Sequence, residues 1–180
     1  MKPAFRAVLL AATVLLLAFG LMHRPSGSDA PLSVGAAAPS ERLPTIEGGE
    51  APIVPPGARL TVVNFWATWC VPCVAEMPSL ERLHRALPGQ GLVVVGVSVD
   101  ETDADVREFV ARAGLHFPVL RDPGGRGAAR VFGVEGYPTT FVIDAKGVVR
   151  ERYLGPVRWD EPEALDHFRG LLSASTSPTR

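Results

Sequence analysis

The sequence predicts an α/β domain in which a central mixed β-sheet carries helices on both faces. Two compact, β-branched apolar runs, at 60–66 and 92–100, are typical of buried strands. Helical patterns follow each of these runs along the chain. Two further strand-like segments, at 139–144 and 148–155, flank a short turn, which indicates an antiparallel hairpin at one edge of the sheet.

Four segments are expected to be helical, because they show helical apolar spacing or are bounded by residues that start and stop helices. Pro88 and Gly89 end the first of them, and Gly114 ends the second. Acidic residues in the first turn of the last segment favour the positive end of a helix. In chain order the segments are 70–87, 103–114, 124–134 and 160–174.

Length and composition indicate a globular domain. A chain of 180 residues is long enough for one domain with a sizeable core. Hydrophobic residues make up 47 % and charged residues 21 %, as in ordinary globular proteins. The net charge of −1 gives no field that would attract nucleic acid, so no nucleic-acid partner is expected.

The N-terminus has the pattern of an export signal. Lys2 and Arg6 precede an uncharged apolar run at 7–22. Residues 1–24 are predicted to be an uncleaved signal anchor that keeps the N-terminus in the cytoplasm. A cleaved signal peptide stays open, because the run is shorter than the roughly 20 apolar residues of a full span. Either interpretation places the domain outside the cytoplasm.

The remaining chain divides by composition. Residues 25–40 are rich in Pro, Gly, Ala and Ser and are predicted to be a flexible linker. The folded domain is expected over 41–175, with a disordered tail at 176–180. Within it, a short strand is expected near Leu43–Ile46 and a short connecting segment at 117–122.

The only two cysteines, Cys70 and Cys73, are separated by two residues. A structural disulfide between them would close almost no chain and would constrain the unfolded state very little. A structural zinc site needs four ligands, and the four histidines do not supply an H-x₃₋₅-H pair. A redox-active pair fits best, because C-x-x-C at a strand-to-helix junction is typical of thiol-disulfide chemistry.

The residues around the pair suit that chemistry. Cys70 falls near the N-cap of the predicted helix, where free backbone N–H groups and the helix dipole favour a thiolate. Cys73, one turn later, is within reach to attack a mixed disulfide. Trp69 is expected beside the exposed sulfur. Pro72 suits the first turn of a helix, where its missing N–H is not needed.

The motifs WATWCVPC and GYPTTFVID, with Pro78 between them, resemble the thioredoxin superfamily. The resemblance implies a thioredoxin-like fold and makes Pro78 the family's proline within the helix. It also implies that Pro138 is the cis-proline that faces the disulfide. Tyr137, before it, would present its backbone to a bound substrate strand.

Two positions narrow the resemblance. Cytoplasmic thioredoxins carry a buried acid six positions before the first cysteine, and here that position is Asn64, which cannot titrate. Glu76 instead lies one helical turn after Cys73. This combination, NFWATWCxPCxxEMP, is similar to the membrane-anchored TlpA/ResA-type thiol-disulfide reductases. That family has a central insertion in the thioredoxin core, and residues 101–133 fit it.

The resemblance implies an exported, membrane-tethered enzyme that reduces disulfides of client proteins. Cys70 and Cys73 would exchange disulfides, with Glu76 assisting proton transfer, so neither a cofactor nor a metal is expected. A carboxylate near the pair raises thiol pKa values and favours a reductant. The implied clients are apocytochrome c or respiratory copper-site proteins, and the implied electron donor is a membrane thiol carrier. The protein is expected to act as a monomer in the bacterial periplasm, anchored in the inner membrane.

Other functions stay open at this point. The same fold can act as a thiol oxidase or isomerase. A peroxide-consuming redoxin is less compatible, because the Pro-x-x-x-Thr-x-x-Cys pattern of such proteins does not precede Cys70. A copper or haem chaperone would need a ligand besides the cysteines. His84 and His116 are candidates for a copper ligand, although surface or half-buried histidines are the simpler interpretation.

Overall fold

The computed structural model describes residues 31–87 and 89–174. Its centre is a five-stranded mixed sheet, so the predicted α/β fold is confirmed. The small antiparallel hairpin of β1 (Arg42–Pro44) and β2 (Glu50–Pro52) forms a second sheet. In spatial order the main strands are β5 (Val119–Arg121), β4 (Leu92–Ser98), β3 (Leu60–Trp66), β6 (Thr139–Asp144) and β7 (Val149–Leu154).

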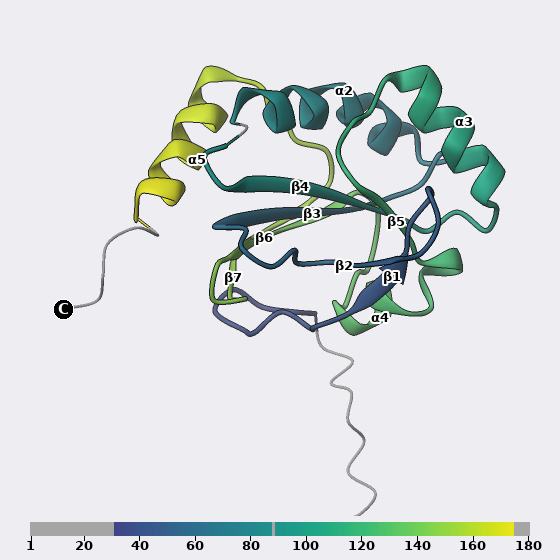
Figure 1. Ribbon diagram of the computed structural model, residues 1–180, viewed down its shortest axis with the longest axis horizontal. Coiled ribbons are helices and arrows are strands. Elements are labelled where there is room, and N and C mark those ends of the chain that lie inside the picture. Colours follow the sequence, from purple (N-terminus) through teal and green to yellow (C-terminus); the bar gives the residue numbers. More distant parts are fainter. Residues whose placement is uncertain (1–30, 88, 175–180) are drawn as a thin grey trace, which may run out of the picture.

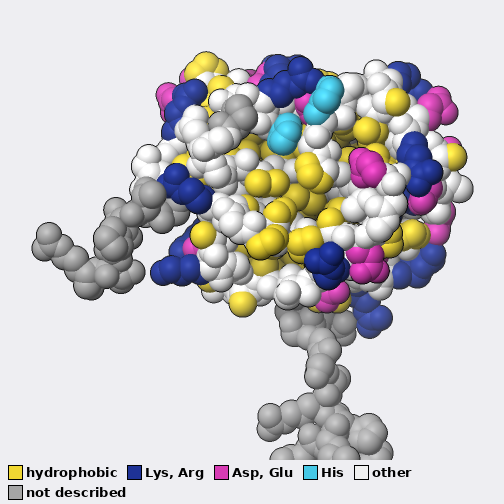
Figure 2. Space-filling view, viewed as in Figure 1, with side chains coloured by type: hydrophobic (Ala, Val, Ile, Leu, Met, Phe, Trp, Pro, Cys, Tyr) yellow, Lys and Arg dark blue, Asp and Glu magenta, His cyan; other side chains and the backbone are white. Residues whose placement is uncertain are grey.

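Helices cover both faces of this sheet (Figure 1). Three of them lie on one side, and the shortest lies on the other side together with the β1–β2 hairpin. In the same view, hydrophobic side chains gather over the β3–β4 region and charged ones surround them (Figure 2). The helices are α2 (Val71–Ala86), α3 (Asp103–Ala113), α4 (Ala128–Val131) and α5 (Pro162–Ala174), with a 3₁₀ turn, η1 (Pro123–Gly125), before α4.

The central strand, β3, is buried along its whole length, as its continuous apolar pattern predicts. It pairs in parallel with β4 and antiparallel with β6. Trp66 therefore lies opposite Ser98, and Phe65 lies opposite Thr139. The carboxyl ends of β3 and β4 and the beginning of β6 thus meet at one end of the sheet.

Helix α2 begins at this end, directly after β3. Cys70 is its N-cap residue and has extended backbone angles, while Pro72 occupies the first turn. Pro78 lies inside the helix, at the position that the sequence resemblance assigns to it. The helix buries one apolar face against the sheet, which includes Met77 and Leu80.

The central insertion is present and is more regular than expected. It contains α3, η1, α4 and the strand β5, which the sequence suggests only as a connecting segment. Three residues are too few to show strand periodicity, but β5 pairs with the last part of β4 and widens the sheet. Helix α3 ends at Gly114, whose left-handed backbone (φ 63°) suits a glycine C-cap.

The N-terminal lead-in differs from the expected linker. Residues 31–40, placed there by composition, lie against the domain: the Gly35 N–H donates to the Val149 carbonyl at 2.8 Å, and the Ala38 N–H donates to the Gly147 carbonyl at 2.7 Å. Backbone pairing, which composition does not reveal, holds this segment.

Within residues 31–87 and 89–174, no helix has the length and hydropathy needed to cross a membrane. The predicted anchor at 1–24 lies outside these ranges. So does the predicted tail at 176–180.

Candidate active site

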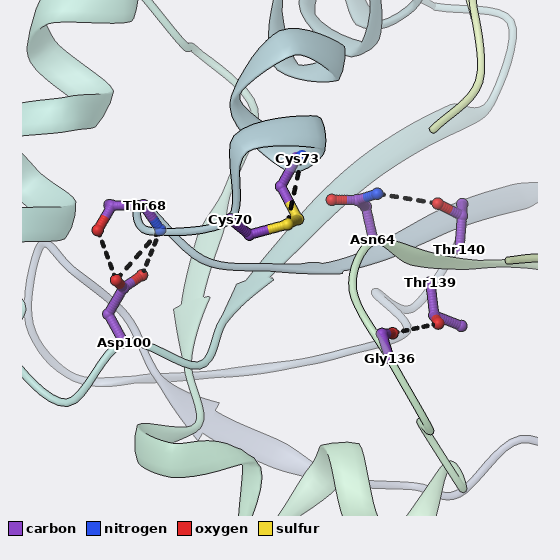
Figure 3. The surroundings of a disulfide bond; sticks show 8 residues. All are labelled: Asn64, Thr68, Cys70, Cys73, Asp100, Gly136, Thr139 and Thr140. Atoms are coloured by element: carbon purple, nitrogen blue, oxygen red, sulfur yellow. Dashed lines mark hydrogen bonds between the residues drawn. A yellow bond between two sulfur atoms is a disulfide. The ribbon is translucent and has the colours of Figure 1, made fainter. Parts of the chain in front are cut away.

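Cys70 and Cys73 form a disulfide with an S–S distance of 2.05 Å (Figure 3). The backbone N–H of Cys73 points at the Cys70 sulfur, 3.3 Å away. Cys70 keeps 6 % of its surface exposed, whereas Cys73 is fully buried. In this arrangement solvent reaches the first cysteine and the helix N-terminus faces its sulfur, which is the geometry of an attacking thiolate.

An apolar rim, formed by Trp69, Val71, Tyr137 and Leu154, lies at the same end of the sheet as Cys70. Trp69 is 64 % exposed and makes an edge-on contact with the Tyr137 ring, with the centroids 5.9 Å apart. Val71 and Leu154 are also exposed, at 80 % and 62 %. Exposed side chains of this size are suited to docking a protein partner.

The Tyr137–Pro138 peptide bond is cis, as the resemblance implies. Pro138 lies directly before β6, and its carbonyl accepts a hydrogen bond from the Gly155 N–H at 2.9 Å. A shallow cavity of about 260 Å³ opens here, lined by Pro138, Leu154 and their neighbours. The sequence-predicted residues Tyr137 and Pro138 therefore lie on a surface that can receive an extended segment.

The 3₁₀ turn of the central insertion lies close to the Tyr137 side chain. A Cβ atom built on Gly125 would lie 2.5 Å from the Tyr137 hydroxyl oxygen, and Gly125 has a positive φ of 66°. Burial raises the pKa of Tyr137, and the negative charge of Asp122 acts in the same direction. The phenol therefore remains neutral and fits closely against the 3₁₀ turn.

Glu76 is buried on α2, three residues after Cys73 and on the same helical side. The Trp159 indole N–H donates a hydrogen bond to its Oε1 atom. Its Oε2 atom has no hydrogen-bond partner among the residues that the structure describes. Desolvation raises the pKa of Glu76 to about 7, although hydrogen bonds from Trp159 and the Val157 backbone act in the opposite direction. A carboxyl group that titrates near neutrality can both take and give a proton.

Asn64 lies on β3 and is fully buried. Its Nδ2 atom donates to the Thr140 hydroxyl oxygen at 2.8 Å. Figure 3 shows the Asn64 side chain next to the disulfide, with Thr140 farther away. The position near the disulfide that carries a buried acid in cytoplasmic thioredoxins therefore holds a neutral polar group here.

A buried polar chain, which sequence reasoning missed, holds the loop before Cys70. The Asp100 carboxylate accepts hydrogen bonds from the Thr68 backbone N–H at 3.0 and 3.1 Å and from the Thr68 hydroxyl at 2.6 Å. The Ser98 hydroxyl donates to the same carboxylate at 2.8 Å. Thr68 is two residues from Cys70, so these bonds fix the path of the loop (Figure 3).

Arg121 connects this chain to the insertion. Its guanidinium group donates to the Ser98 hydroxyl, the Asp100 carbonyl and the Asp103 carboxylate at 2.7, 2.7 and 2.8 Å. Arg121 is only 2 % exposed. The signal that could have revealed the chain is an aspartate directly after one apolar strand and an arginine inside the next apolar segment, because buried charges need partners.

The two histidines weighed as copper ligands do not join the cysteines in a metal-binding group. The His116 backbone N–H and ring Nδ1 lie 2.8 and 3.0 Å from the Glu81 carboxylate. His84 makes an edge-on contact with Phe117. Among the described residues, no group of three or more His, Cys, Asp or Glu side chains is placed to hold a metal ion.

Comparisons with known proteins agree with this site. Residues 34–152 match the model of the AhpC/TSA family. The chain is 32 % identical over 166 residues to the thioredoxin-like protein YneN of Bacillus subtilis, covering 91 % of this chain and 96 % of that protein. It is also 32 % identical over 151 residues to the thiol-disulfide oxidoreductase ResA of Bacillus anthracis, covering 84 % and 87 %.

Solved structures give the same result. A thiol:disulfide interchange protein from Chlorobium tepidum superimposes with a TM-score of 0.65 and 27 % identity over 81 % of this chain and 99 % of that one. A secreted Mycobacterium tuberculosis disulfide oxidoreductase, homologous to Escherichia coli DsbE, does so with a TM-score of 0.57 and 26 % identity over 75 % and 96 %. This chain belongs to the AhpC/TSA family and is a thioredoxin-like thiol-disulfide oxidoreductase similar to ResA.

Proposed function

We propose that this oxidoreductase works as a reductant, anchored in the inner membrane with its domain in the periplasm. The observation that carries the direction is the buried, titratable Glu76 carboxyl group on α2, about one helical turn after Cys73. A nearby carboxylate disfavours a thiolate by like-charge repulsion. Strong oxidants of this fold depend on a stabilised reduced form, and a thiolate held at low pKa supplies that stability.

The reaction begins with the exposed cysteine. In the reduced protein, the Cys70 thiolate attacks one sulfur of a client disulfide. A mixed disulfide forms, and the other client sulfur leaves as a thiolate. The N-terminus of α2 stabilises the attacking thiolate, while Trp69, Tyr137 and Pro138 hold the client segment against the sulfur.

The buried cysteine completes the exchange. Glu76 accepts the proton of the Cys73 thiol, and the resulting thiolate attacks the Cys70 sulfur. The Cys70–Cys73 disulfide forms and the second client sulfur is released. The client gains two electrons, which the protein loses. Pro72 limits motion between the two sulfurs during this step.

The proposed anchor and partners follow from the sequence and from the relatives. Lys2, Arg6 and the apolar run at 7–22 supply the anchor, and a relative described as secreted supports an extracytoplasmic domain. A membrane thiol carrier restores the dithiol. The proposed clients are apocytochrome c and respiratory copper-site proteins, whose cysteine pairs must be reduced before haem or copper is bound. The domain acts as a monomer.

Client trapping tests this function. In a Cys73→Ser chain the mixed disulfide cannot be resolved, so Cys70 should remain bonded to its client in the cell envelope, where mass spectrometry identifies the partner. A Cys70→Ser chain is the control and should trap nothing. If Cys73→Ser also accumulates no mixed disulfide, the protein does not reduce envelope proteins.

The reduction potential tests the direction. Equilibration with glutathione should give a value below about −200 mV, whereas a value near −120 mV, the range of strong oxidants, would show an oxidase. Anchoring is tested separately by carbonate extraction of membranes. The full chain should remain in the pellet, and release into the supernatant would contradict the anchor.

A further inference from the structure

Asn64 holds a buried acceptor that no described residue of the oxidised protein uses. Its side chain is fully buried, and its Oδ1 atom has no hydrogen-bond partner among the described residues. A buried carbonyl oxygen without a partner is uncommon, because it loses its hydrogen bonds to water without compensation. The amide nitrogen, in contrast, is satisfied by the Thr140 hydroxyl at 2.8 Å.

The orientation of the amide directs this oxygen to the redox centre. In Figure 3 the Asn64 oxygen lies on the side of Cys73, and the nitrogen lies on the side of Thr140. Thr140 is the β6 residue paired with Asn64 across the two strands, so the bond that fixes the amide lies within the sheet. The backbone that holds Asn64 is buried along all of β3.

Reduction creates a donor beside this acceptor. Two electrons and two protons convert the Cys70–Cys73 disulfide into two thiols. Cys70 keeps 6 % of its surface exposed, but Cys73 is fully buried, so its S–H group cannot turn to bulk water. We propose that Oδ1 of Asn64 accepts the hydrogen bond of the Cys73 thiol in the reduced protein.

This contact favours the dithiol in two ways. It satisfies Asn64 only in the reduced protein, so it stabilises the dithiol relative to the disulfide. A carboxamide oxygen also accepts from the thiol but cannot bind the proton, so it stabilises the neutral form of Cys73 over the thiolate. The inference rests on the redox cycle of the pair and does not depend on which client the protein reduces.

Replacing the amide tests the inference. Asn64→Leu keeps the approximate volume and removes the acceptor. The oxidised protein then loses a buried unpaired oxygen, and the reduced protein loses a hydrogen bond. Both changes favour the disulfide. We expect the equilibrium constant with glutathione to move about tenfold toward the disulfide, which is about 30 mV more negative in reduction potential.

Thr61→Val is the matched control. Thr61 is on the same strand, is 1 % exposed, and its hydroxyl oxygen also lacks a partner among the described residues. Its replacement should leave the glutathione equilibrium unchanged. An equal shift in both variants would mean that any change of packing along β3 alters the equilibrium, whether or not it removes the amide oxygen. A shift of Asn64→Leu toward the dithiol would show that Asn64 stabilises the disulfide, and either result overturns the inference.

A second measurement does not require Asn64→Leu to fold. In a Cys70→Ser chain, Cys73 is the only thiol, and its Raman S–H stretching band reports hydrogen bonding directly. The band should lie at lower frequency than that of a free thiol. A band at the frequency of a free thiol would overturn the inference even if client trapping succeeds, while failed trapping with a lowered band would leave it standing.

Discussion

Glu76 combines a carboxyl group that is only 2 % exposed with a hydrogen bond from an indole, and its protonation follows mainly from its burial. In water the carboxyl group would ionise near pH 4.5, but burial moves its pKa to about 7. The folded protein therefore binds a proton that the unfolded chain releases over this interval. Glu76 thus links folding to the binding of a proton.

Stability should report this link. Because the folded pKa lies above the unfolded one, protonated Glu76 stabilises the oxidised protein fully below about pH 4.5, and this is lost as pH rises through about 7. Relative to Glu76→Gln, the free energy of unfolding of the natural protein should fall by up to about 3 kcal/mol across this window. Urea unfolding of both proteins between pH 4 and about pH 8 measures the difference, which should be independent of pH if Glu76 titrates normally.

The indole that holds Glu76 should tune its pKa. Trp159→Phe keeps an aromatic ring next to Tyr153 and removes the N–H donor, so the pKa of Glu76 should rise by roughly one pH unit. Carboxyl ¹³C NMR measures the titration. Trp66→Phe is the control, because its indole nitrogen has no partner among the described residues. An equal rise in this control would assign the effect to packing.

For single residues, the sequence predicts which side chains lie near one another along a helix. It does not predict contacts between segments that are far apart in the chain. The spacing along one helix placed Glu76 near Cys73, and the family motif identified Tyr137 and Pro138. Trp159 lies 83 residues from Glu76, and no local pattern connects the two. The same holds for Asn64 and Thr140, whose contact depends on strand register.

At the level of elements, the insertion is joined to the catalytic loop by charge. Arg121 on β5 and Asp103 at the start of α3 form the outer part of this connection, and Ser98, Asp100 and Thr68 form the inner part. The insertion therefore supports the loop that presents Cys70.

Replacing the buried Arg121 should clearly reduce the stability of the protein. Arg121→Met leaves the buried Ser98 hydroxyl and Asp100 carbonyl without the donors that Arg121 supplies, so the free energy of unfolding should fall by about 1–3 kcal/mol. Arg169→Met removes an exposed ion pair with Asp166 and should cost less than about 1 kcal/mol. Denaturant unfolding of the two oxidised variants compares them. Similar losses in both would mean that Asp100 does not depend on Arg121.

The element order could be predicted because long buried strands and bounded helices leave strong local patterns. The range 60–66 is the same in sequence and structure, and α2 differs from its expected range by one residue at each end. Of the three-residue strands, β1 lies near the strand expected at Leu43–Ile46, whereas β2 and β5 could not be predicted, because they are short and depend on partners elsewhere. The pairing of residues 31–40 with the domain has the same cause.

For the whole molecule, topology collects the functional groups at one end of the sheet. Cys70 follows β3, Asp100 follows β4, Pro138 precedes β6 and Leu154 ends β7. No two of these residues are adjacent in sequence, but parallel and antiparallel pairing brings their strand ends together. The fold therefore assembles the site from several segments that are far apart in the sequence.

Client selection should depend on this rim. Leu154→Lys places a charge on a docking surface, so kcat/KM for a protein disulfide should fall about tenfold or more. The rate with a small disulfide such as oxidised glutathione should stay unchanged. Val34→Lys is the control, because Val34 is also 62 % exposed but lies near the other end of β7. If both variants lose the same activity, the rim does not dock clients.

Gly125 gives the insertion a means of adjusting selectivity at a distance. A single methyl group there would collide with the Tyr137 hydroxyl and push the ring that meets Trp69. Divergence in this one turn can therefore reshape the mouth of the site while both sulfurs and Glu76 stay in place. Evolution, or an engineer, can in this way change which clients enter without altering the electron chemistry.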